Sequence, residues 1–235
     1  NEDNGELYKH DQTVVTKADT EINEFLINQV KEKYPEHSVD GEEEQFGESN
    51  YIWVCDPVDG TAAYSRRIPV AVFSLALVVD GAPQIGVVYD PFTDSIYYAT
   101  KGNGAYRNGN VIKVNNIGFN DKKSMSNCDM WPSCKYNMYD VLNVLGKKSH
   151  FVAIGSVTRA GICVADGSFN VAIFPGTTHK NCDIAAVKVI VEEAGGKVTD
   201  LFGEEQRYDR DIRGAVMSNG IVHDEVVECI KEFLD

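Results

Sequence analysis

The chain has 235 residues, of which 22 are basic and 36 acidic, so its formal net charge is −14. The length is sufficient for a sizeable core, and 43% hydrophobic and 25% charged residues are typical of a globular protein. Because so acidic a surface repels nucleic acid and anionic membranes, we expect neither as a partner. No apolar run approaches the ~20 residues that a membrane-spanning helix needs.

The start of the chain and its cysteines bear on the compartment. Residues 1–4 are polar or acidic, so we expect no signal peptide, and the lack of an initiator methionine leaves open whether natural N-terminal residues are missing. Six cysteines occur without a CxxC pair, which favours neither a zinc site nor a disulfide framework. We therefore expect reduced, mostly buried thiols in a cytoplasmic protein. They are Cys55, Cys128, Cys134, Cys163, Cys182 and Cys229.

The first predicted element is a helix over residues 19–34, where apolar side chains recur at helical spacing until Pro35 ends the pattern. Cap-type residues precede it, so Asp19 is expected at or just before the helix N-terminus, and local reasoning favours a capping carboxylate. The acidic run over residues 40–44 is typical of a solvated loop. It lies shortly before Asp56, however, so Glu42 and Asp56 could converge.

An apolar strand over residues 51–55 leads into Asp56-Pro57-Val58-Asp59-Gly60-Thr61. The rest of this half is predicted to form an antiparallel sheet with one or two helices. It comprises a short helix or turn at 62–67, strands at 71–79, 84–89 and 95–99, and turns at 80–81, 101–106 and 108–109.

The second half changes to alternating helices and strands. Residues 115–150 show few signals beyond a surface loop at 121–124 and a short helix at 139–145. Strands are then predicted at 151–154, 169–174, 197–199 and 215–217, and helices at 158–165, 183–194 and 222–234. We expect two tightly packed subdomains, residues 1–114 and 115–235, in a mixed α+β and α/β fold.

The stretch from Asp56 to Thr61 concentrates chemistry. Asp56 and Asp59 can be plain turn residues, since aspartate favours turns. Their spacing can also direct two carboxylates to one side of a bend, where they repel unless cations bind, and Mg²⁺ prefers such oxygen ligands. Gly60 and Thr61 begin a helix or turn whose free backbone N–H groups favour phosphate. Together these features predict phosphoryl transfer.

Five motifs in this order resemble the inositol monophosphatase superfamily, which includes fructose-1,6-bisphosphatase-like and other sugar phosphatases. The resemblance runs from Val14 nearly to the end of the chain. It is carried by Val15-Thr16-Lys17-Ala18-Asp19, Gly41-Glu42-Glu43, Asp56-Pro57-Val58-Asp59-Gly60-Thr61, Lys101-Gly102-Asn103-Gly104-Ala105, and Cys182-Asp183-Ile184-Ala185-Ala186 followed by Glu193-Ala194-Gly195-Gly196.

The resemblance implies a layered αβαβα sandwich, two or three Mg²⁺ ions, lithium sensitivity and a homodimer. It implies that Glu42, Asp56 and the carbonyl of Val58 hold one ion, and that Glu42 also serves a weaker third. The second ion is held by Asp56, Asp59 and Asp183. Local reasoning alone makes Asp183 a helix cap.

Roles in catalysis and substrate binding are implied in the same way. Thr61, oriented by Asp19, positions or deprotonates the attacking water, with Glu42 as the third catalytic residue, while the amides of Gly60 and Thr61 grip the phosphate. The other implied substrate contacts are Asp59, Asp183 and the loop of Gly155, Ser156 and Val157.

The chain also departs from the family. Cys182 stands where the family often has tryptophan, and it is expected to pack rather than react. Residues 174–181 contain no carboxylate, although the family's inositol enzymes hold the ring with one there. For His179 and Lys180 we weigh contact with a second phosphate against a solvated loop, which is favoured, and for Arg66 and Arg67 the same two alternatives stand.

The expected function is that of a Mg²⁺-dependent phosphomonoesterase acting on a small phosphorylated metabolite, of the inositol-1-phosphate or fructose-1,6-bisphosphate type, by metal-activated water. The alternatives are a 3′-nucleotide or histidinol-phosphate phosphatase, or a non-catalytic regulatory protein that retains the fold.

Overall fold

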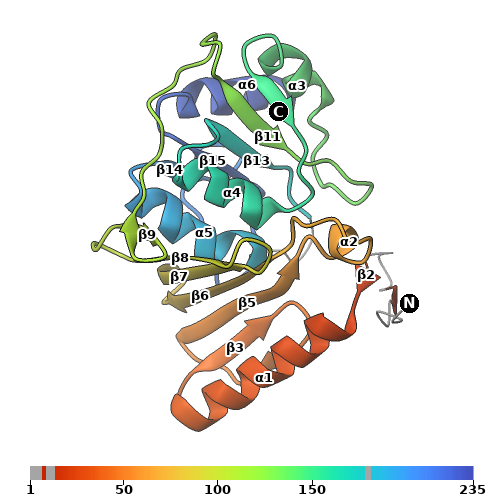
Figure 1. The fold of residues 1–235 in the computed structure, drawn as a ribbon, viewed down its shortest axis with the longest axis vertical. Coiled ribbons are helices and arrows are strands. Elements are labelled where there is room, and N and C mark those ends of the chain that lie inside the picture. Colours follow the sequence, from red (N-terminus) through yellow and green to blue (C-terminus); the bar gives the residue numbers. More distant parts are fainter. Residues whose placement is uncertain (1–6, 9–13, 178–180, 235) are drawn as a thin grey trace.

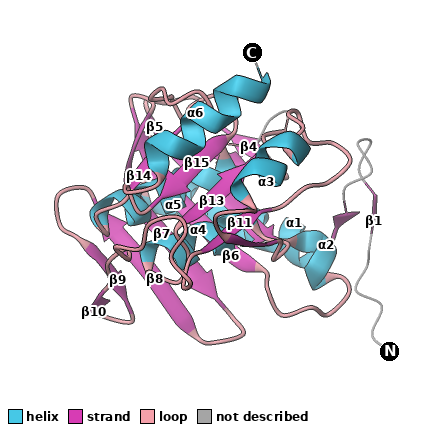
Figure 2. Ribbon diagram, turned by 90° about the horizontal axis from the view of Figure 1, so that it is seen from above, coloured by secondary structure: helices cyan, strands magenta, loops and turns pink. Residues whose placement is uncertain are grey.

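The computed structural model describes residues 7–8, 14–177 and 181–234. The chain forms five layers in which helices and sheets alternate, as Figure 1 shows. Helix α1 (Lys17–Lys33) covers the outer face of the first sheet, and α4 (Val157–Ala165) and α5 (Cys182–Glu193) separate this sheet from the second. Helices α3 (Tyr139–Leu145) and α6 (His223–Leu234) cover the far face of the second sheet (Figure 2). The predicted αβαβα sandwich is confirmed.

The first sheet has eight strands in the order β10-β9-β8-β7-β6-β5-β3-β4. All neighbours are antiparallel except β3 and β5, which run parallel. The strands are β3 (Ser38–Gly41), β4 (Gln45–Phe46), β5 (Tyr51–Asp59), β6 (Val72–Val79), β7 (Ala82–Asp90), β8 (Ser95–Thr100), β9 (Ala105–Arg107) and β10 (Asn110–Val111). A separate ribbon pairs β1 (Leu7–Tyr8) with β2 (Val14–Val15).

The second sheet has five strands in the order β12-β11-β13-β15-β14. Strands β12, β11 and β13 run parallel to one another, and β15 is antiparallel to both of its neighbours. The strands are β11 (Met125–Cys128), β12 (His150–Val152), β13 (Val171–Phe174), β14 (Lys197–Thr199) and β15 (Ala215–Ser218). The subdomain boundary predicted at residue 115 falls between β10 and β11, where the chain passes from one sheet to the other.

Most predicted helices and strands agree with the structure to within two residues at each end. Three predictions were wrong, and strand β11 was missed. Strand β5 continues through Asp59 instead of ending at residue 55, because its pairing with β6 resumes at Asp59 after an irregularity. The acidic run includes the end of β3, the turn material after residue 100 contains β9 and β10, and β11 occupies a stretch without a predicted strand.

Helix α5 is buried from Cys182 to Val191, and most of these residues are apolar, which fits a helix that is covered by a sheet on each face. It approaches β7 so closely that a Cβ on Gly86 would lie 2.2 Å from the carbonyl oxygen of Ala186. At its C-terminal end the Glu193 carboxylate accepts hydrogen bonds of 2.7 Å from the amides of Gly102 and Gly104. Two of the five family motifs therefore form one structural contact between α5 and the first sheet.

The cysteines are unpaired and mostly buried, as predicted, since all six are free and four of them are buried. Among the helices that the structure describes, none is both long and apolar enough to cross a bilayer.

Candidate active site

The parallel pairing of β3 with β5 brings the acidic run to the Asp56 turn. Gly41 pairs with Cys55, and the Glu42 amide donates a 3.0 Å hydrogen bond to the Cys55 carbonyl. Glu42 therefore follows β3 at the same sheet edge at which Asp56 stands in β5. The two acidic segments converge, which the sequence left open.

The N-terminus of α5 reaches the same place from the other layer. Ser74, the partner of Asp56 on β6, donates its hydroxyl to the carbonyl of Cys182 at 3.3 Å. Asp183 is the second residue of α5, after the N-cap residue Asn181. A segment more than a hundred residues downstream is thus fixed beside the Asp56 strand.

Asp56, Cys182 and Asp183 form a buried cluster whose candidate metal-binding atoms all lie within 4.8 Å of one another. Asp56 also accepts a 2.9 Å hydrogen bond from the Val58 amide, and the Cys182 thiol donates to Asp183 at 3.4 Å. Two carboxylates held this close fit a hard divalent cation, which would offset their repulsion. The thiol of Cys182 is a soft donor that Mg²⁺ does not favour.

Asp59 is tied to the N-terminus of α4 and lies outside this cluster. Its Oδ2 accepts hydrogen bonds of 2.6 Å from both the Ser156 hydroxyl and the Thr158 amide. Thr158 in turn donates its hydroxyl to the Asp183 carbonyl at 2.8 Å. Thr158, which no motif indicated, therefore joins two of the predicted ligand segments. Its only signal was that Thr158 and Arg159 are polar residues in an otherwise apolar helix.

The Gly60–Thr61 turn packs against the predicted substrate-side loop. Gly60 has a φ of +91°, and a Cβ there would lie 3.0 Å from the carbonyl oxygen of Gly155. Thr61 begins the short helix α2 (Thr61–Tyr64), and its hydroxyl donates to the Val58 carbonyl at 2.8 Å. A carbonyl oxygen has a second lone pair, so this bond leaves Val58 able to bind a cation.

Asp19 combines the local interpretation with the one that the resemblance implies. It is the third residue of α1, and its Oδ2 accepts hydrogen bonds from the Thr16 amide and hydroxyl at 2.8 and 2.6 Å, as in a capping box. Its Oδ1 lies 3.5 Å from the Thr61 hydroxyl. Burial raises the pKa of Asp19, with a smaller contribution from the nearby Glu42, while the bonds from Thr16 oppose the shift.

Ser156, which donates to Asp59, also caps α4 by accepting from the Arg159 amide at 3.1 Å. Arg66 and Arg67 are exposed, and Arg66 donates to the carbonyl of Ala62 within its own turn. His179 and Lys180 lie outside the described residues.

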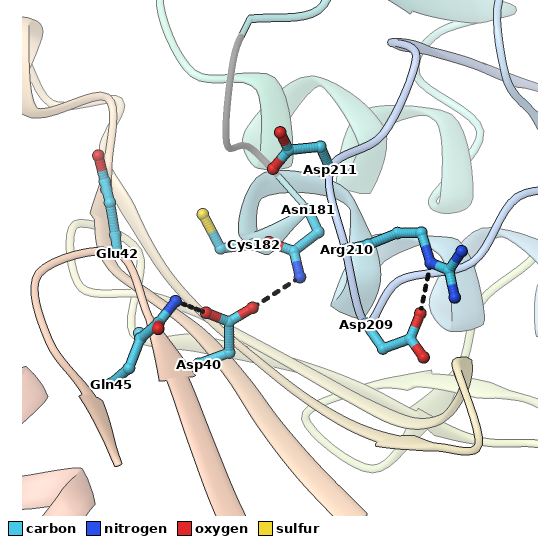
Figure 3. A pocket seen from close by; sticks show the side chains of 9 residues that line it. Asp40, Glu42, Gln45, Asn181, Cys182, Asp209, Arg210 and Asp211 are labelled. Carbon is cyan, nitrogen blue, oxygen red and sulfur yellow. Dashed lines mark hydrogen bonds and ion pairs between the residues drawn. The ribbon is translucent and has the colours of Figure 1, made fainter. Parts of the chain in front are cut away.

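A polar pocket of about 270 Å³ opens beside Glu42 and Cys182 (Figure 3). Between these two residues and the loop of residues 209–211, Asp40 accepts hydrogen bonds from Gln45 and from Asn181. Asn181 also donates to the carbonyl of Tyr208 at 2.8 Å, so it fixes the start of α5 both to β3, through Asp40, and to the segment that contains Tyr208. The sequence did not predict these hydrogen bonds of Asp40 and Asn181.

The sandwich fold and its acidic, phosphate-compatible turn define a phosphatase that hydrolyses phosphoric monoesters and has a cluster able to bind metal. The chain belongs to the inositol monophosphatase family, whose model matches residues 1–233.

Individual relatives agree with this assignment. A fructose-1,6-bisphosphatase/inositol-1-monophosphatase of Thermotoga maritima is 30% identical, over 99% of this chain and 88% of its own. A histidinol-phosphatase of Chlorobaculum parvum is 31% identical, over 94% and 85%. The solved structure of a Thermotoga maritima inositol monophosphatase (IMPase) superposes with a TM-score of 0.82 at 29% identity, covering 94% of this chain and 84% of that one.

Proposed function

We propose that this phosphatase depends on Mg²⁺ and removes the phosphate from a small sugar or inositol phosphate. The observation that carries the proposal is the convergence of Asp56 and Asp183, buried and far apart in sequence, into one cluster beside the Glu42 pocket. Thr158 links this cluster to Asp59, since its amide donates to Asp59 and its hydroxyl to the Asp183 carbonyl. Carboxylates brought together in this way repel one another, so their arrangement makes sense as a site for divalent cations.

In this proposal Asp56, Asp183, Asp59, Glu42 and the carbonyl of Val58 hold two or three Mg²⁺ ions. Bound Mg²⁺ supplies charge neutralisation for the phosphate and lowers the pKa of water. The protein must therefore supply orientation and a proton acceptor.

The proton path that we propose starts at Thr61. Its hydroxyl is fixed by the Val58 carbonyl and lies near Asp19 Oδ1. Because Thr16 occupies Asp19 Oδ2 with two hydrogen bonds, Oδ1 is the oxygen that faces Thr61. Asp19, whose pKa is raised by burial, is then suited to accept a proton that the attacking water releases through Thr61.

The phosphate is placed by the turn itself. The first backbone N–H groups of a helix have no partner inside that helix, and here they follow Gly60. The left-handed conformation of Gly60 and its close contact with Gly155 fix the turn against the loop that would face the rest of the substrate.

Several phosphorylated metabolites are candidate substrates. The similarity to the bisphosphatase/monophosphatase of Thermotoga maritima favours fructose 1,6-bisphosphate or inositol 1-phosphate. The similarity to a histidinol-phosphatase makes histidinol phosphate the second candidate. A 3′-nucleotide substrate and a non-catalytic regulatory role remain the alternatives.

A phosphate-release screen tests the proposal. Purified protein is incubated with about twenty phosphorylated metabolites, with Mg²⁺ or with EDTA, and direct competition then ranks the substrates that react. We expect rapid release from a sugar or inositol phosphate, its abolition by EDTA and its inhibition by Li⁺. If Mg²⁺ supports no release from any compound, the regulatory role replaces this proposal.

We also propose a cytoplasmic homodimer. Six free cysteines support a reducing compartment. The hairpin of β7 and β8 exposes Tyr89, Phe92 and Ile96, and such a clustered apolar surface supports association. Size-exclusion chromatography with light scattering should give twice the 26.0 kDa chain mass.

A further inference from the structure

Three parallel strands of the second sheet end at one edge beside the candidate site. In the ladder, Asn127 of β11 pairs with Val152 of β12 and Cys128 pairs with Ile173 of β13. Asp129 follows β11, Gly155 follows β12 and Thr177 follows β13. Ligands of α/β proteins collect outside the carboxyl ends of parallel strands. Only Gly155 was expected to contribute.

One carboxylate oxygen of Asp129 accepts a hydrogen bond, and the other has no hydrogen-bond partner. It is 7% exposed, and its Oδ1 accepts a 2.8 Å hydrogen bond from the Gly155 amide. Its Oδ2 is buried and has no partner in hydrogen-bonding geometry. Burial raises the pKa of Asp129, against smaller lowering effects of Gly155, Asn127 and Ile154. A buried polar atom without a partner destabilises a fold, so such an atom calls for an explanation.

A second open atom lies at the same edge. Thr177 follows β13 by three residues, is 8% exposed, and its buried hydroxyl has no partner. Within the described part of the chain, four side chains hold a buried atom of this kind, and two of them follow adjacent strands here. The two others, Asn23 and Tyr208, belong to different regions of the fold.

Asp129 is also connected to the phosphate turn by direct contacts. It holds the amide of Gly155, and the carbonyl of Gly155 packs against Gly60. The next residue, Ser156, donates its hydroxyl to Asp59. These contacts place the strand edge that carries Asp129 next to the turn at which the phosphate is proposed to bind. Hydroxyl groups on the rest of the substrate would supply the donors that Oδ2 lacks.

We propose that Asp129 and Thr177 bind the hydroxyl groups of a polyol substrate, and that Asp129 is a specificity-determining residue of the enzyme. This inference rests on the proposed phosphatase function. It assigns the carboxylate that recognises the polyol to the segment after β11, whereas residues 174–181, which include Thr177, contain no carboxylate. The competing explanation is that Asp129 only positions Gly155 and, through it, the phosphate turn.

The test compares two variants on two kinds of substrate. Asp129→Asn keeps the size of the side chain and removes its charge, and Thr177→Val removes only a hydroxyl. Asp121→Asn, on the exposed loop before β11, is the matched control. Each protein is assayed with inositol 1-phosphate and fructose 1,6-bisphosphate, and with 4-nitrophenyl phosphate, which has no hydroxyl group.

We expect Asp129→Asn to raise KM for the better polyol phosphate about tenfold or more, as loss of a hydrogen bond to a charged group does. Thr177→Val should raise it about threefold, the effect of a neutral hydrogen bond. The kcat/KM for 4-nitrophenyl phosphate should stay within about twofold of the wild type, because the phosphate turn is not altered.

Equal losses on both kinds of substrate would show that Asp129 merely positions Gly155, and unchanged kinetics on both would remove it from the site; either result overturns the inference. If Asp129→Asn fails to fold in a thermal melt, Thr177→Val decides by the same comparison. A wild type that releases no phosphate from any substrate in Mg²⁺ refutes the phosphatase proposal itself, without reference to a variant.

Discussion

Replacing Asp183 by Asn should stabilise the metal-free protein and abolish its stabilisation by Mg²⁺. Asp56 is 1% exposed and Asp183 5% exposed, and their candidate ligand atoms lie within 4.8 Å. At this separation two unit charges repel by about 3 kcal/mol for an effective dielectric constant of ~20. An amide removes that repulsion, although it weakens the hydrogen bond from the Cys182 thiol. We therefore expect a net gain of about 1–2 kcal/mol in EDTA.

Urea unfolding with EDTA or with Mg²⁺ measures both effects. Mg²⁺ at a hundred times its Kd should add about 2.7 kcal/mol to the unfolding free energy of the wild type. For a chain of this size that gain raises Tm by roughly 5–10 °C. Asp183→Asn should gain almost nothing from Mg²⁺, while Asp140→Asn, at the exposed start of α3, should behave as the wild type. An Asp183→Asn protein that is weaker in EDTA and still stabilised by Mg²⁺ would refute this reasoning.

Two further substitutions probe the support of the site and the pH dependence of stability. Gly41→Ala should lower kcat/KM on the order of 10- to 100-fold by displacing the neighbouring Glu42, because its Cβ would lie 2.0 Å from Asn23 Oδ1 and 2.7 Å from the Glu44 carbonyl oxygen. Gly118→Ala, whose Cβ would make an ordinary contact, is the control. Equal activities of the two variants would contradict the prediction. Burial lowers the pKa of His223 to about 4, so between pH 6.5 and 4 the unfolded chain binds a proton that the folded chain does not. Acidification from pH 8 to pH 5 should therefore lower the free energy of unfolding by about 2 kcal/mol. His223→Gln should remove that part of the slope in urea titrations, and an unchanged slope would show that His223 is not its source.

The fold was predictable where local pattern and burial agree. Helix α5 is strongly apolar and buried over most of its length, and β6 alternates buried and half-buried positions, so both elements could be predicted from the sequence. Strand β11 did not, because its Ser126 and Asn127 are polar. They are buried through bonds to partners far along the chain, Ser126 with the Ser149 hydroxyl and Asn127 with the Val152 carbonyl. When the polar side chains of a strand are hydrogen-bonded by residues far along the chain, the local sequence shows no strand pattern.

The candidate site divides in the same way. Asp56, Asp59 and Asp183 stand in contiguous motifs, so they could be named from the sequence. Thr158 and Asp129 could not be, because they matter through backbone contacts that only the folded chain creates, with Asp59 and with Gly155. Asp19 shows a further limit, since one carboxylate both caps α1 and faces Thr61, and local reasoning considers these roles separately.

The most direct test of the central claim is the rate of phosphate release by Asp59→Asn in saturating Mg²⁺. Asp59 holds the loop before α4 through two 2.6 Å hydrogen bonds, and we propose that it also binds a cation. Ser156→Ala, which removes one of these bonds and keeps the charge, separates the two roles. We predict that Asp59→Asn lowers kcat at least ~10²-fold, and that Ser156→Ala lowers it much less. Asp59→Asn turnover at the wild-type rate would contradict a metal-dependent phosphatase at this turn.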